Sequence, residues 1–141
     1  MKRILLGVGL ALGLAACGSP GAAFVGTWAD AGGSQTVSCT TGDNETKPTA
    51  GNTTIVEGTD SDIVLTNAGG CNIKYDVEGK VATAVAGQTC PVDTLTAKIV
   101  TSILTLSGDG KSFTETDTAT VTGPGGSCTI SSTSSNTKVG K

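Results

Sequence analysis

The feature that most constrains the fold is a strict alternation of apolar and polar residues between Cys71 and Glu78. The apolar members are Cys71, Ile73, Tyr75 and Val77, and every residue between them is polar. A period of two puts alternate side chains on opposite faces of a β-strand. We therefore expect a strand here with one buried face and one solvated face.

Further segments of the same kind recur along the chain, separated by turns rich in Gly, Asn and Asp. They span 35–39, 53–56, 63–66, 81–85, 95–106, 113–122 and 127–132. In 95–106 the apolar phase changes from odd to even positions, which predicts a β-bulge between Val100 and Ile103. Residues 40–52 are polar and contain Pro48 and Gly51, so we expect a loop there.

This pattern predicts an all-β fold, a small antiparallel meander of about eight or nine strands. A meander that closes into a barrel has no free sheet edge, and we therefore expect a barrel, with a β-sandwich as the alternative. The domain is expected to span 24–133. We expect 134–141 to be a flexible tail because it follows the last expected strand.

The N-terminal segment is built differently from the rest. The charged Met1-Lys2-Arg3 precedes an apolar run from Ile4 to Leu14, and small residues lead up to Cys17. This order is typical of a secretory signal peptide. The apolar run is about half the ~20 residues that a transmembrane helix needs.

Leu14-Ala15-Ala16-Cys17 resembles the lipobox of bacterial lipoproteins. The resemblance implies that residues 1–16 are cleaved, that Cys17 carries a lipid, and that 17–23 is a tether to the membrane. Gly18 follows Cys17 where an Asp would signal retention in the inner membrane. The resemblance therefore implies a lipid anchor in the outer membrane of a Gram-negative bacterium, on its periplasmic or its outer face.

The other four cysteines, an even number in an exported chain, predict two disulfides. A hairpin that turns at Glu78-Gly79 brings Cys71 close to Cys90. Closure of a barrel brings Cys39 on an early strand next to Cys128 on the last. We therefore predict the pairs Cys71–Cys90 and Cys39–Cys128.

Composition excludes several functions. Beyond Arg3 the chain has no Arg, it has no His anywhere, and seven lysines stand against twelve acids after residue 16. Nucleic-acid binding needs clustered cations, so we expect none. Without His, and without closely spaced cysteine pairs, we expect no catalytic site, no metal site and no cofactor. Only 25 large apolar residues follow residue 16, so the disulfides must support a thin core.

Phe24-Val25-Gly26-Thr27-Trp28 resembles the opening Gly-x-Trp strand of the lipocalins, fatty-acid-binding proteins and avidins. The resemblance implies a lipocalin-like barrel in which Trp28 plugs one end. The chain lacks the late Arg that packs on the tryptophan in lipocalins and the additional tryptophans that line the avidin site. The ligand-binding residues of those families are therefore not carried over.

Two patterns share the segment 113–122. Its even positions are all Thr, from Thr114 to Thr122, and we expect them to form a solvated face because 98–106 offers no matching ladder of hydroxyls. Glu115 and Asp117 fall on the other face, with Phe113, Ala119 and Val121. If that face is interior the two acids need a partner, and Lys98 or Lys111 is expected to neutralise one of them.

These observations favour a non-enzymatic envelope lipoprotein with a structural or binding role. One alternative is a lipocalin-like carrier of a small apolar ligand, which needs an unfilled interior of about 300 Å³ or more. Another is an inhibitor of a foreign enzyme, which would bind a protein partner.

Overall fold

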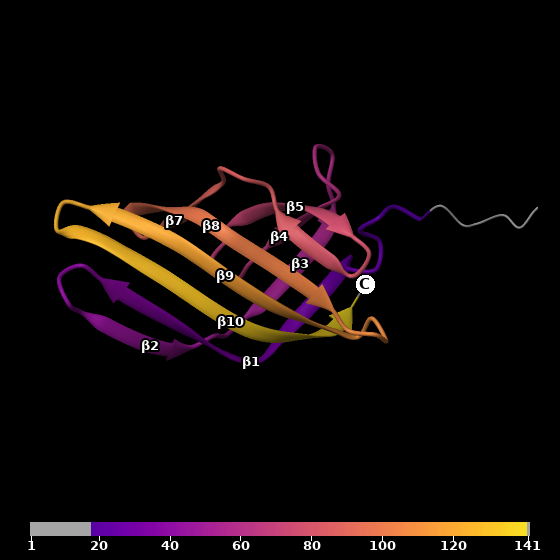
Figure 1. Cartoon of the computed structure of the whole chain (residues 1–141). Coiled ribbons are helices and arrows are strands. Elements are labelled where there is room, and N and C mark those ends of the chain that lie inside the picture. The colour runs from indigo at the N-terminus through magenta and orange to yellow at the C-terminus, as the bar shows by residue number, and fades with distance from the viewer. Residues whose placement is uncertain (1–17, 141) are drawn as a thin grey trace, which may run out of the picture.

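The structure is a computed structural model that describes residues 18–140 (Figure 1). The expected signal peptide 1–16 and Cys17 lie outside these residues. The described chain consists of ten β-strands joined by turns, and none of its segments is a helix that could span a membrane. The strands are β1 (Gly26–Cys39), β2 (Asn44–Pro48), β3 (Asn52–Glu57), β4 (Ile63–Thr66), β5 (Asn72–Glu78), β6 (Val81–Ala84), β7 (Thr89–Val92), β8 (Leu95–Leu106), β9 (Ser112–Gly123) and β10 (Gly126–Gly140).

Eight of the strands form a closed antiparallel barrel, which confirms the predicted fold over the sandwich alternative. Their order is β1-β3-β4-β5-β6-β8-β9-β10, and β10 pairs with β1 to close the circle. β2 and β7 are additional strands outside this circle. β2 pairs with the second half of β1, and β7 pairs with the first half of β8.

The long strands β1, β8, β9 and β10 continue beyond the barrel (Figure 1). β1 pairs with β3 over 26–29 and with β2 over 34–38. β8 pairs with β7 over 95–98 and with β6 over 103–105. The barrel therefore opens at one end into a sheet of order β2-β1-β10-β9-β8-β7, whose inner face continues the barrel interior.

The opposite end of the barrel is filled by aromatic side chains. Trp28 is fully buried, and its Nε1 donates a hydrogen bond to the carbonyl oxygen of Phe24 at 2.8 Å. Its ring packs against Phe113 in an edge-to-face arrangement, with 4.8 Å between the two ring centroids. Gly26 has φ +142°, and a Cβ there would lie 2.5 Å from the carbonyl oxygen of Gly140. The Gly of the Gly-x-Trp pattern is thus required by close approach of β10. We call this the closed end.

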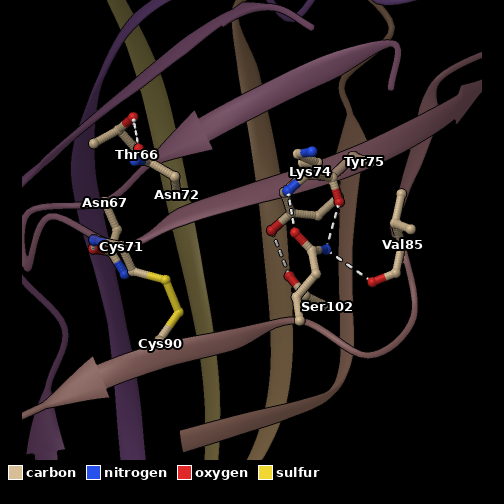
Figure 2. The surroundings of a disulfide bond; sticks show 10 residues. Thr66, Asn67, Cys71, Asn72, Lys74, Tyr75, Val85, Cys90 and Ser102 are labelled. Carbon is tan, nitrogen blue, oxygen red and sulfur yellow. Dashed lines mark hydrogen bonds between the residues drawn. A yellow bond between two sulfur atoms is a disulfide. The ribbon is translucent and has the colours of Figure 1, made fainter. Parts of the chain in front are cut away.

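Both predicted disulfides are present. Cys39–Cys128 joins directly opposed residues at the far end of the β1–β10 ladder. Cys71–Cys90 joins the residue before β5 to β7 (Figure 2). Between them in sequence, the Gln88 side chain donates to the carbonyl oxygens of Lys74 and Val85, and this holds the curled 85–89 segment against β5.

Three local predictions need correction. The expected tail 134–141 is wrong, because β10 runs to Gly140 and pairs with β1, and Asn136 is only 2% exposed. The barrel domain therefore extends past the predicted end at 133. The expected loop 40–52 contains β2, whose residues are all exposed and which is held by backbone pairing with β1 and by a hydrogen bond of 3.1 Å between the hydroxyls of Thr36 and Thr46. The bulge in β8 lies at Val100, between the paired residues Ile99 and Thr101, at the start of the segment predicted for it.

Candidate ligand site

The site is built on the inward face of β9, which carries Phe113, Glu115, Asp117, Ala119 and Val121 at alternate positions. Phe113 belongs to the closed end, and Ala119 and Val121 belong to the sheet beyond the barrel. Glu115 and Asp117 lie between them, at the junction, and both are partly buried. The two acids that share a face in the sequence pattern therefore do point to the interior.

Hydroxyl and amide groups of β10 line up beside the two acids. Ser132 lies opposite Asp117 and donates to its Oδ2 at 3.1 Å, and Ser134 lies opposite Glu115 and donates to its Oε2 at 3.5 Å. Asn136 in turn donates to Ser134 Oγ at 3.0 Å. Ser134 and Asn136 were not predicted to face the interior because they fall in the expected tail, although with Ser132 they continue the strand period of two.

No lysine neutralises the pair, contrary to the prediction. Lys98 lies opposite Thr120 on the outward face, and Lys111 lies in the turn at the closed end. Within residues 18–140 the ion pairs are Lys47–Glu45 and Lys74–Asp60, both on the surface. Asp117 Oδ1 is buried and has no hydrogen-bond partner among the described residues.

This environment changes the protonation of both acids. Burial, followed by the charge of Asp117, raises the pKa of Glu115 from 4.5 to about 8. Burial also raises the pKa of Asp117, and the Ser102 hydroxyl, the Ser132 hydroxyl and the Glu115 carboxyl group offset part of that rise. Two carboxylates this close disfavour double ionisation, so at neutral pH Glu115 holds a proton and Asp117 is the anionic member.

Tyr75 and Ser102 extend the polar group into the barrel. The two hydroxyls are 2.6 Å apart, and both residues are almost completely buried (Figure 2). Burial and the nearby Glu115 hold the pKa of Tyr75 far above its ordinary value, so the phenol stays neutral. Ser102 was not predicted to face inward, because it lies inside the segment assigned to the bulge, between Val100 and Ile103. With the bulge at Val100, Ser102 is in phase with Leu104 and turns inward.

A cavity of about 440 Å³ lies on the open side of the two acids. Its walls come from the sheet beyond the barrel and from the 67–73 segment, and Glu115 and Asp117 form its inner end. The Cys71–Cys90 disulfide lines its side. We call this cavity the trough; its aliphatic side chains are Ile73, Val92, Ala97, Ile99, Ala119 and Ile130.

A second cavity, of about 110 Å³, lies on the other side of the same acids and is lined by polar groups including Asp30, Thr49 and Asn136. Thr49 Oγ1 is buried there without a partner among the described residues. The two acids thus separate an apolar space from a polar one. Within residues 18–140 no group of three or more metal-ligating side chains gathers.

Comparisons with protein-family models, with curated proteins and with solved structures give no match. Function must therefore be argued from the site itself. An aliphatic wall that ends in a buried carboxyl pair is suited to binding a molecule with an apolar body and a cationic head.

Proposed function

We propose that this protein is a non-enzymatic binding protein of the bacterial outer membrane, anchored through a lipid on Cys17, whose trough takes a small apolar amine. The observation that carries the proposal is the buried carboxyl pair of Glu115 and Asp117, which lies at the inner end of a partly aliphatic cavity of about 440 Å³ and forms no ion pair among the described residues. An ammonium group beside this pair supplies the positive charge that the described side chains do not.

A carboxylate buried without a cation is destabilising, and so is an ammonium buried without an anion. Together the two groups form a charge-assisted hydrogen bond worth about 1.5–3 kcal/mol. The aliphatic walls favour the body of the ligand at about 25 cal/mol per Å² of apolar surface removed from water. The trough also exceeds the ~300 Å³ that a small-molecule site requires.

The envelope location rests on the lipobox resemblance of Leu14 to Cys17, and the two disulfides agree with an oxidising compartment. The absence of His in the chain supports the proposal that the protein is not an enzyme.

Three rigid probes with the same ring and different heads test this proposal. They are 1-naphthylmethylamine, 1-naphthylmethanol and 1-naphthoic acid, titrated at pH 7 against the protein by fluorescence and calorimetry. We expect the amine to bind at least tenfold more tightly than the alcohol, and the acid to bind most weakly. Asp117→Asn should lower the affinity for the amine to that for the alcohol and leave the affinity for the alcohol unchanged.

Asp76→Asn is the matched control, because Asp76 is exposed on the outward face of β5. It should change none of the three affinities. Equal binding of amine and alcohol would show that the trough takes apolar molecules without using Asp117. Binding of none of the probes would refute the trough as a ligand site of this kind.

A further inference from the structure

The outward face opposite the trough carries a regular array of hydroxyl groups. On β9 these are the threonines at 114, 116, 118, 120 and 122. β8 places only Thr101 and Thr105 opposite them, whereas β10 supplies a complete neighbouring ladder. The directly paired residues are Thr114–Ser135, Thr116–Thr133, Thr118–Ser131, Thr120–Thr129 and Thr122–Ser127. The sequence prediction considered β8 alone and therefore missed this ladder.

The array continues onto β1 and β2. Ser34, Thr36 and Ser38 of β1 pair with Thr133, Ser131 and Thr129 in the same register, and Thr36 pairs with Thr46 of β2. One row crosses five strands, through Thr101, Thr118, Ser131, Thr36 and Thr46. With ~4.8 Å between neighbouring strands, this row is roughly 19 Å long. We call these hydroxyl-bearing residues of β9, β10, β1 and β2 the hydroxyl face.

Strand propensity does not explain the composition of this face. Thr favours strands, but the face also uses Ser34, Ser38, Ser131 and Ser135, and Ser has no such preference. The property that all members share is the hydroxyl group, which both donates and accepts hydrogen bonds. Most of these side chains are exposed, including Thr116, Thr133 and Ser131.

Charge is excluded from this face although the chain is acidic. The charged residues of β9 are Glu115 and Asp117, and both point inward. The outward residues of β10 between 127 and 137 are all Ser or Thr, and Lys98 on β8 is the nearest cation, opposite Thr120. A solvated face ordinarily mixes both signs of charge, so a neutral face of this extent fits a neutral partner.

We propose that the hydroxyl face binds a neutral polysaccharide, whose chain lies across the strands along the hydroxyl rows. Adjacent strands of a sheet are rotated by about 20–25°, and the outside of a barrel is convex. Ice is the other partner that a regular hydroxyl array could bind. A flat ice plane meets only a few rows of such a surface, whereas a flexible glycan chain follows its twist. This site is separate from the trough and does not depend on it.

The strength of this binding should depend on chain length. Each hydrogen bond exchanged with water contributes only about 0.5–1.5 kcal/mol, and the face has no aromatic side chain on which a sugar could stack. Several rungs must therefore act together. We expect binding to a polymer and none that is measurable to its disaccharide.

The test is sedimentation of the full-length protein, in a polyoxyethylene detergent, with amorphous cellulose and with carboxymethyl cellulose as its anionic counterpart. We expect retention on cellulose and at least fivefold less on the anionic form. Thr36→Val with Thr118→Val should lower retention on cellulose at least fivefold, because Val keeps the β-branched shape and removes the hydroxyl. Ser131→Ala provides a second, single substitution in the same row.

Thr54→Val with Thr83→Val is the matched control, because both residues are exposed threonines on β3 and β6 outside the hydroxyl face. This variant should be retained like the parent, and all variants should keep both disulfides and bind 1-naphthylmethylamine like the parent. Equal retention of the two double variants would overturn the proposal. So would failure of the parent to bind cellulose, including the case in which it shapes ice crystals instead.

Discussion

At Glu115 the chain places an ionisable group where strands of this kind ordinarily carry an aliphatic side chain. The burial is tolerated because the carboxyl group keeps its proton, with a pKa of about 8, and because Ser134 faces it from β10. A neutral carboxyl group costs far less to bury than a carboxylate. Its partner Asp117 carries the charge, and a buried carboxyl pair that forms no ion pair among the described residues is the feature on which the proposed ligand site depends.

Glu115 should make the stability of the protein depend on pH. Its pKa is higher in the folded state than the ordinary 4.5, so the folded state binds more protons between these values, and stability falls as the pH rises from about 4.5 to 8. We expect Glu115→Gln to stabilise the protein by up to about 5 kcal/mol at pH 9 and by almost nothing at pH 4. Urea unfolding at both pH values measures this, with the exposed Glu78→Gln as control. An equal effect at the two pH values would contradict it.

At the scale of elements, alternation predicted β3, β4, β5, β6, β8 and β9 and the inward face of each acid, because burial on one side imposes a period of two. Alternation missed β7, a four-residue strand with a single buried side chain, Cys90. It did not predict β2, whose five residues are exposed and have no apolar pattern. It ended the chain too early for the same reason: the inward residues of late β10 are Ser134 and Asn136, which look like solvated residues. Apolar periodicity therefore could not predict that Ser134 and Asn136 belong to the site.

The two disulfides should separate stability from binding. In the chain-entropy account, Cys39–Cys128, which closes a sequence separation of 89, contributes about 4.5 kcal/mol, and Cys71–Cys90, which closes 19, contributes about 3 kcal/mol. Paired Cys→Ser substitution at 39 and 128 should thus cost more stability in urea. Substitution at 71 and 90 should instead cause the larger loss of affinity for 1-naphthylmethylamine, because that disulfide lines the trough. The opposite ranking in both measurements would refute this division.

On the scale of the whole molecule, the closed end and the open end have different surroundings. The described chain begins at the closed end, where Ser19 Oγ donates to Glu57 at 2.6 Å and Lys138 Nζ donates to the carbonyl oxygen of Ala23 at 3.4 Å. Two residues separate Ser19 from Cys17, and they can span at most about 7 Å of chain. If Cys17 carries the proposed lipid, the anchor therefore holds the closed end at the membrane.

This geometry predicts that the trough opens away from the bilayer. The turns at the two ends of β9 are separated by its 12 residues, roughly 40 Å of extended chain. A fluorophore on Lys111→Cys, at the closed end, should be strongly quenched by nitroxide lipids in proteoliposomes, and one on Gly125→Cys, at the open end, should not. Cys17→Ser should abolish palmitate incorporation and membrane association, which serves as the control for anchoring. Equal quenching at both positions would mean that the domain lies flat, with its hydroxyl face or its trough against lipid, and would refute the upright orientation.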